Sequence, residues 1–119
     1  MIKDNEPVFK VSQVAKHLKM SADRLRTYDE EKLVAPTREN NVRLYSNIDI
    51  EWLQNLRQLI TKDKLTIFGF KEILRLTYSM SNEDFNKFVK KQHKDSIWPY
   101  FAAMRKNPNY DKLKNFYHN

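Results

Sequence analysis

Two short helix patterns, separated by about three residues, constrain this fold more than any other feature of the sequence. The first begins at Ser12, a residue type that caps helix N-termini well. Its apolar residues have the spacing of one buried helical face and are Val14, Ala15 and Leu18. Ser21 caps the second pattern, in which Leu25 and Tyr28 give the buried spacing. Two short helices joined by so short a connection, with a cap on the second, are typical of a helix-turn-helix.

A β-hairpin is predicted after the second helix. Pro36 ends any helix and requires an extended approach. Asn40 and Asn41 tolerate the positive φ of a tight turn, and the residues on either side of them suit short strands. This hairpin would be the wing of a winged helix-turn-helix. Residues 8–11 alternate apolar and polar and predict a short extended lead-in.

Two longer helices are predicted next. Ser46 and Asp49 form a capping box ahead of one apolar stripe: Trp52, Leu53, Leu56, Leu59 and Ile60. Thr66 is the predicted cap of the following helix, whose apolar residues recur at three- and four-residue intervals: Ile67, Phe70, Ile73 and Leu74. Gly69, the chain's one glycine, falls inside that helix, where glycine costs about 1 kcal/mol relative to alanine.

Beyond Leu76 the predicted helices are shorter. Ser81 and Asp84 make another capping box, and Pro99 opens a helix that Pro108 stops. Residues 109–119 predict one more turn.

Composition favours a basic, globular protein. The chain has 22 Lys and Arg against 15 Asp and Glu, a net charge of +7, which favours a polyanionic partner. A lysine-rich surface that only keeps a small protein soluble is the alternative. No stretch approaches the roughly 20 apolar residues of a membrane span, and residues 1–8 have no apolar signal segment. These features predict a cytoplasmic protein, associated with the nucleoid if it binds DNA.

The sequence has no recognisable catalytic or metal-binding motif. The absence of cysteine excludes disulfides and thiolate sites. His17, His93 and His118 lie far apart, and none has a carboxylate or second histidine at helical ligand spacing. There is no glycine-rich phosphate loop and no histidine–carboxylate motif. We therefore expect no enzyme activity, no metal and no cofactor.

Residues 9–76 resemble the DNA-binding domain of MerR-family regulators. The resemblance rests on the order and spacing of short motifs: residues 11–15, 25–29, 33–38, 43–46 and 70–74, with Asp49 and Leu53. It implies a mainly α fold, a winged helix-turn-helix with a small β-hairpin wing, followed here by a short helical C-terminal extension at 77–119. Residues 1–8 would be a flexible N-terminus.

The resemblance also implies a set of DNA-binding residues on the helix-turn-helix and the wing: Lys16, Lys19, Ser21, Arg24, Arg26, Thr27, Tyr28, Arg38, Arg43 and Tyr45. Guanidinium groups at Arg24 and Arg26 can bind guanine edges or phosphates, and Arg38 and Arg43 would reach the flanking minor groove or backbone. Alternatives stay open for several of these. Tyr28 and Tyr45 are also suited to packing in the core, and Lys16, Lys19 and Arg38 to being solvated surface charges.

Three positions depart from the family pattern. Thr27 stands where many members have tyrosine, and Lys32 and the Asn40–Asn41 turn stand where glycines are usual. Asparagine adopts positive φ more readily than other non-glycine residues. The sequence offers no such explanation for Lys32.

The extension departs further. MerR regulators usually continue into a long helix that pairs with its twin, but no heptad stripe follows Leu76, and residues 77–119 are too few for a separate effector domain. They form either a dimerisation arm or helices folded back on the DNA-binding domain, with Trp98, Tyr100, Phe101 and Met104 in the core. An aromatic ligand cage is the alternative for these four side chains.

The function predicted from these features is sequence-specific binding of double-stranded DNA by a MerR-like transcription regulator. A homodimer through residues 77–119 and contact with RNA polymerase or another regulator are the partners that this hypothesis adds. The alternatives are an excisionase-like or architectural protein that binds DNA as monomers, or a protein-interaction module on the same fold. The four arginines at 24, 26, 38 and 43 argue against the last.

Overall fold

The computed structural model describes residues 1–92 and 97–117. The chain divides into two compact units, Met1–Gln54 and Asn55–Asn119. His93 and His118, two of the three histidines of the chain, lie outside the described residues. Within the described part of the chain, no helix is both long enough and apolar enough to cross a membrane.

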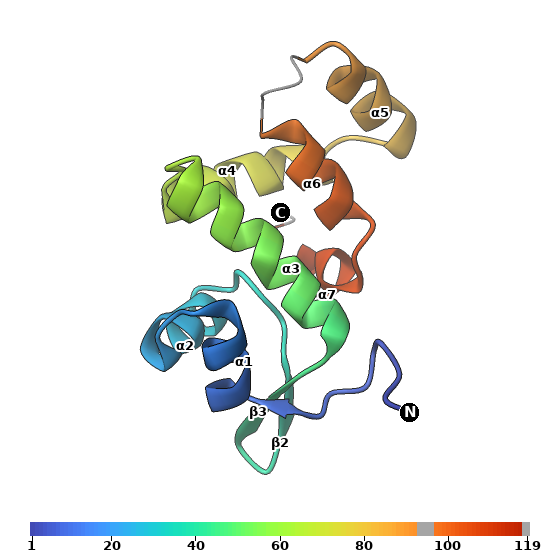
Figure 1. The fold of residues 1–119 in the computed structure, drawn as a ribbon. Helices are drawn as coiled ribbons and strands as arrows, with labels where there is room; N and C mark the ends of the chain where they lie inside the picture. The colour runs from blue at the N-terminus through green and yellow to red at the C-terminus, as the bar shows by residue number, and fades with distance from the viewer. Residues whose placement is uncertain (93–96, 118–119) are drawn as a thin grey trace. The chain divides into compact units, whose positions relative to one another are not determined.

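The first unit contains the helix-turn-helix and the wing that the sequence predicts (Figure 1), and the rest of the predicted 9–76 domain continues into the second unit. In chain order the first unit contains β1 (Phe9–Lys10), α1 (Val11–Leu18), α2 (Ala22–Glu30), β2 (Thr37–Glu39), β3 (Val42–Tyr45) and the start of α3 (Asn47–Arg57). Its buried side chains come from every one of these helices. Trp52 of α3 is fully buried, and its indole Nε1 donates a 2.6 Å hydrogen bond to the carbonyl of Leu33.

The wing is part of a three-stranded antiparallel sheet in the order β1-β3-β2. The predicted lead-in pairs with the wing, Phe9 opposite Tyr45. Asn40 and Asn41 form the turn with φ of 51° and 65°, which confirms the positive-φ prediction. The same register places Arg38 directly opposite Arg43. Like charges in that position repel each other across a strand pair, so the wing requires a nearby negative charge.

Most of the predicted helix starts are confirmed. The hydroxyl of Ser21 accepts the backbone N–H of Arg24 at 3.0 Å, and the box of Ser46 and Asp49 closes with bonds of 2.9 and 3.1 Å. The predicted Ser12 cap is wrong. Strand β1 continues to Lys10, so α1 begins one residue before Ser12, and the backbone N–H of Lys10 donates to the side chain of Gln13 at 2.8 Å.

The backbone at the end of α2 shows what kind of position Lys32 occupies, which the sequence did not explain. Lys32 has φ of 63°, in the left-handed region. Its N–H donates to the carbonyl of Asp29 at 3.0 Å, and the N–H of Leu33 donates to that of Tyr28 at 2.8 Å. This bonding pattern is a Schellman motif, in which the residue after the cap is usually glycine. Lys32 therefore occupies a glycine-type backbone position.

The second unit is helical. It contains the end of α3, a π-helical turn η1 (Gln58–Lys62), α4 (Ile67–Tyr78), α5 (Asn82–Lys90), α6 (Trp98–Arg105) and α7 (Pro108–Tyr117). Thr66 and Ser81 cap α4 and α5 as predicted, with bonds of 2.9 and 3.0 Å. The prediction of one turn after Pro108 was too short, because α7 has ten residues and buries Tyr110, Leu113 and Tyr117.

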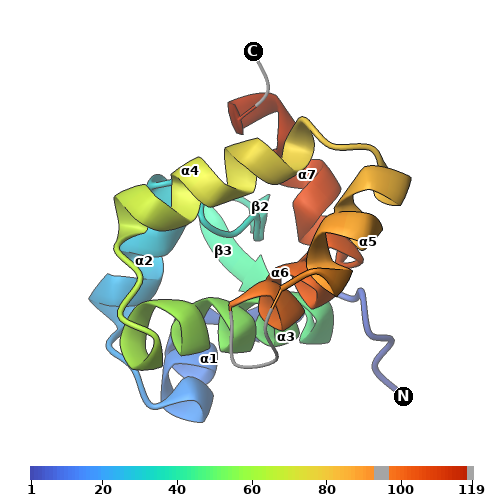
Figure 2. The same cartoon turned by 90° about the horizontal axis from the view of Figure 1, so that it is seen from above.

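Helices α6 and α7 pack against α4, and α5 packs against α6 (Figure 2). Phe101 of α6 stacks on Phe70 of α4, with ring centroids 5.5 Å apart. Tyr110 of α7 stacks on Tyr78 at 4.2 Å. Of the four side chains predicted as core, Phe101 and Met104 are buried, whereas Trp98 and Tyr100 are half-buried. Within the chain, the extension packs against α4, and its role as a dimerisation arm stays a prediction.

Arg105, at the end of α6, joins three segments of this unit. Its Nη1 and Nη2 donate 2.6 Å bonds to the carbonyls of Thr77, in the last turn of α4, and of Met80, just after that helix. Its Nε donates to the side-chain oxygen of Asn82 at 3.1 Å, and the guanidinium lies 4.6 Å from the ring centroid of Phe85. One side chain thus holds the end of α4, the start of α5 and the end of α6 together.

Candidate nucleic-acid interface

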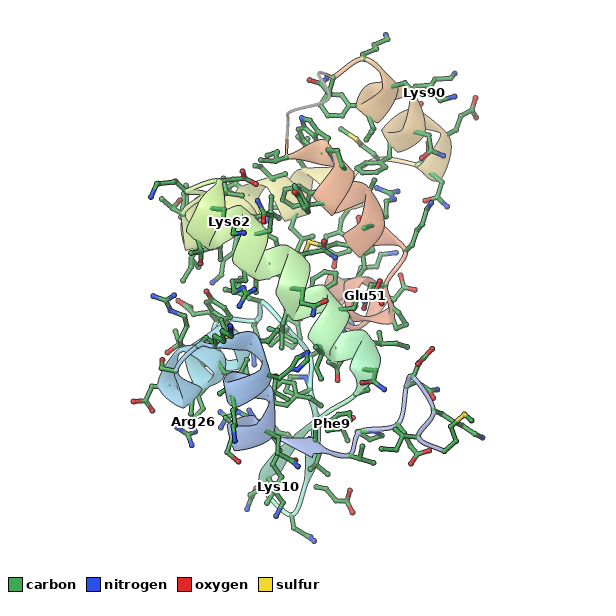
Figure 3. The ribbon with its side chains drawn as sticks, in the orientation of Figure 1. Phe9, Lys10, Arg26, Glu51, Lys62 and Lys90 are labelled. Carbon is green, nitrogen blue, oxygen red and sulfur yellow. The ribbon has the colours of Figure 1, made fainter. Side chains whose placement is uncertain are left out.

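Helix α2 separates its side chains into a buried and an exposed face. Leu25 and Tyr28 are buried, whereas Arg24, Arg26 and Thr27 are exposed (Figure 3 labels Arg26). The other predicted residues at the helix-turn-helix, Lys16, Lys19 and Ser21, are also exposed. Six of the ten predicted residues therefore lie at the surface of α2, of the turn before it and of the end of α1.

Some of these side chains already have a local role. The hydroxyl of Ser21 is the cap of α2, and the hydroxyl of Thr27 donates to the carbonyl of Asp23 at 3.0 Å. Arg26 pairs with the carboxylate of Asp23 at 2.9 Å, but both side chains are exposed. An exposed pair of this kind is worth less than about 1 kcal/mol, so Arg26 is readily available to another partner.

The two predicted tyrosines lie in the core. Burial raises the pKa of Tyr28, while the positive charge of Arg24 acts in the opposite direction. Burial raises the pKa of Tyr45 much further, helped by the negative charge of Asp29. The Tyr45 hydroxyl has no hydrogen-bond partner among the described residues. Both rings serve as packing residues, and their contact with DNA stays a prediction.

The two predicted wing arginines converge on Asp29 of α2. A single carboxylate oxygen, Oδ2, accepts from Nη2 of Arg38 and, at 2.5 Å, from Nε of Arg43. Glu30 lies 3.7 Å from Nη2 of Arg43. The Asp29 side chain is only 8% exposed. Its carboxylate supplies the negative charge that the opposed arginines of the wing require, and it fixes the wing to α2.

The two arginines are held to different extents. The Arg43 side chain is 17% exposed, and its bond to Asp29 raises the pKa of its guanidinium. The Arg38 side chain is 50% exposed, so much of its guanidinium faces solvent. Arg43 is therefore the anchored member of the pair, and Arg38 is the member with a surface free to meet a phosphate.

Sequence reasoning missed Asp29. A partial signal was present, because Asp29 follows the buried Tyr28 and lies four residues after the buried Leu25, close to the apolar face of α2. A carboxylate so placed requires a cationic partner when it is buried. The partners lie nine and fourteen residues away on the wing, so the register of the hairpin had to be known first.

No metal centre is visible in the described residues, since none of their His, Cys, Asp and Glu side chains form a group of three or more able to hold an ion. The first unit also has a hollow of about 360 Å³, lined by Phe9, Gln13, Val14, His17, Asn47 and Ile50. It brings together none of the ten predicted residues.

Comparison with known proteins places this interface in a family. Residues 9–77 match the family described as MerR HTH family regulatory protein. The HTH-type transcriptional regulators GlnR of Bacillus anthracis and of Bacillus cereus are each 35% identical to the chain over 69 residues. The match covers 57% of this chain and 53% of each relative, so the chain spans about half the length of these relatives. With more than half of its length matched, the chain belongs to the MerR family of helix-turn-helix regulatory proteins.

Proposed function

We propose that this chain regulates transcription by binding specific sites in double-stranded DNA. Helix α2 lies in the major groove and the β2–β3 wing lies on the flanking backbone or minor groove. The observation that carries this proposal is the capped helix α2, which exposes Arg24 and Arg26 beside a wing that Asp29 holds against the same helix.

The chemistry of these groups suits the two kinds of DNA contact. Arginine forms bidentate hydrogen bonds with the N7 and O6 atoms of guanine in the major groove. Arg38, half exposed at the wing, suits a phosphate, and phosphate contacts set the register of a protein on the duplex. Contact with RNA polymerase or another regulator is the further part of this proposal.

Replacing Arg26 with alanine should weaken specific binding by about 1–3 kcal/mol if its guanidinium binds a base. Arg75→Ala is the matched control, because Arg75 also pairs with an acidic residue three positions away on an exposed helical surface. Sites selected from random or genomic DNA supply the specific duplex, and a gel-shift titration gives the affinity of each variant for it. Equal affinities for Arg26→Ala and Arg75→Ala would remove Arg26 from the interface.

The packing of the extension favours binding as monomers side by side on DNA over a preassembled dimer. Most of the large apolar residues of α5 to α7 are buried or half-buried within the chain, and among the described residues of these helices Phe116 of α7 is the exposed one, at 55%. The buried ones are Phe85, Phe101, Met104, Tyr110, Leu113 and Tyr117. We therefore expect a monomer at tens of micromolar in size-exclusion chromatography with light scattering. A stable dimer without DNA would contradict this expectation. A palindromic selected site would show that two copies meet on DNA.

A further inference from the structure

The excess positive charge of the chain lies entirely in the second unit. Residues 1–54 hold nine Lys and Arg and nine Asp and Glu, whereas residues 55–119 hold thirteen and six. The unit that contains the helix-turn-helix is therefore neutral overall, and the helical unit carries the full +7. A charge difference of this size between two parts of a chain points to a polyanion as the partner of the basic part.

A polar groove in the second unit has the chemistry of an anion site. The α5–α6 groove has a volume of about 490 Å³ and is lined by Asn82, Phe85, Asn86, Ala102, Arg105 and Lys106. None of these residues is acidic. Asn82 and Asn86 lie one turn apart on α5, and Asn86 and Lys106 are exposed. Lysine, arginine and asparagine side chains are common donors to phosphate oxygens.

Arg105 brings an uncompensated charge to this groove. Its guanidinium donates to two backbone carbonyls, to the amide oxygen of Asn82 and, at 3.4 Å, to the hydroxyl of Tyr110. These acceptors are all neutral, and none of the ion pairs among the described residues includes Arg105. A half-buried cation without a carboxylate partner, next to the ammonium of Lys106, attracts an anion.

The bond from Arg105 also orients one of the donors. Because the side-chain oxygen of Asn82 accepts from Nε of Arg105, its amide nitrogen remains available to donate. The groove thus combines two charges with the amide groups of Asn82 and Asn86. Bonds that include a charged partner are about twice as strong as neutral ones.

We propose that the α5–α6 groove binds a phosphate of the DNA backbone, as a second contact outside the helix-turn-helix. This inference rests on the function proposed above, since it takes the same duplex as the anion. Helix α3 is shared by both units, so the second contact forms within a complex that already exists. Linking two contacts in this way raises affinity without any change in either one.

The test compares charge changes inside and outside the groove in the full chain. Lys106→Gln removes an ammonium from the groove, and Lys112→Gln removes one from the exposed face of α7, outside the groove. Affinity is measured between 50 and 200 mM salt for a specific and a non-specific duplex. Lys106→Gln should reduce the log–log salt slope by about 0.9 and weaken binding roughly fivefold at physiological salt on both duplexes. Lys112→Gln should leave the slope unchanged.

A second pair of variants places a carboxylate in the groove without a change of size. Asn86→Asp should weaken DNA binding more than Lys106→Gln, whereas Asn115→Asp, exposed on α7, should have little effect. Thermal melting of all four variants checks that the fold is kept. If the groove variants bind like their controls while the wild type binds DNA, the groove proposal is overturned and the helix-turn-helix proposal stands.

Two further outcomes distinguish DNA phosphate from free phosphate, and the groove proposal from the helix-turn-helix proposal. Inorganic phosphate is titrated into the chain without DNA, with the amide signals of Asn82, Asn86 and Lys106 followed by NMR. Shifts at millimolar phosphate without any effect of the groove variants on DNA affinity would assign the site to a free anion, against the proposal. Absence of binding by the wild type to any duplex at low salt would overturn both proposals.

Discussion

Replacing Asp29 with alanine should lower the free energy of unfolding by about 2–3 kcal/mol and weaken DNA binding as well. Removal of one partner from a buried ion pair costs about 3–5 kcal/mol. We expect the smaller loss of about 2–3 kcal/mol because the Arg38 side chain is half exposed and its charge is screened by water. Arg43, only 17% exposed, would lose its anchor. Without the carboxylate, the directly opposed Arg38 and Arg43 would repel each other across the strand pair.

Urea unfolding at neutral pH measures this loss, with Asp23→Ala as the matched control. Asp23 lies on the same helix and also pairs with an arginine, but its side chain is 95% exposed. Loss of its ion pair should therefore lower the free energy of unfolding by well under about 1 kcal/mol. Asp29→Ala combined with Arg38→Ala should recover part of the stability, because the repulsion within the wing is gone. If Asp29→Ala were no less stable than Asp23→Ala, Asp29 would not be what holds the wing to α2.

Replacing Arg105 with methionine should destabilise the second unit by about 3 kcal/mol. The carbonyls of Thr77 and Met80 each lose a 2.6 Å bond to a charged donor. A buried acceptor left without a partner costs about 1–3 kcal/mol, and Thr77 is 1% exposed. Methionine retains most of the aliphatic length of arginine, so the loss reports the hydrogen bonds rather than a cavity.

Lys106→Met is the control for this variant, because it removes the same charge from the next residue. Lys106 is exposed, and surface substitutions of this kind usually change stability by less than about 0.5 kcal/mol. Hydrogen exchange of the α5 amides, alongside urea unfolding, should show faster exchange in Arg105→Met alone. Equal stability of the two variants would mean that the guanidinium does not join α4, α5 and α6 energetically.

The features that could be predicted from the sequence depend on residues close together in the chain. The cap of Ser21 on Arg24, the box of Ser46 and Asp49, and the turn at Asn40 and Asn41 all form within four residues. Each depends on the chemistry of a few neighbouring side chains. Helix α2 and the wing could be predicted from these local signals.

The features that escaped prediction depend on contacts between distant residues. Arg105 bonds to Thr77 across 28 positions, and the partners of Asp29 are set by the register of the wing. The length of α7 follows from its packing on α4. Neither spacing nor composition reports such contacts. Lys32 is an intermediate case, since its departure from glycine was visible in the sequence, but its left-handed backbone was not.

The placement of the two tryptophans gives each unit its own optical reporter. Trp52 lies in the first unit, fully buried and hydrogen-bonded to Leu33. Trp98 lies in the second, half-buried with its ring edge-on to Phe88 at 4.7 Å. Because a fully buried indole fluoresces at shorter wavelengths than one partly in water, the emission spectrum distinguishes Trp52 from Trp98. Unfolding of the DNA-binding unit and of the helical unit can therefore be followed one at a time within the intact chain.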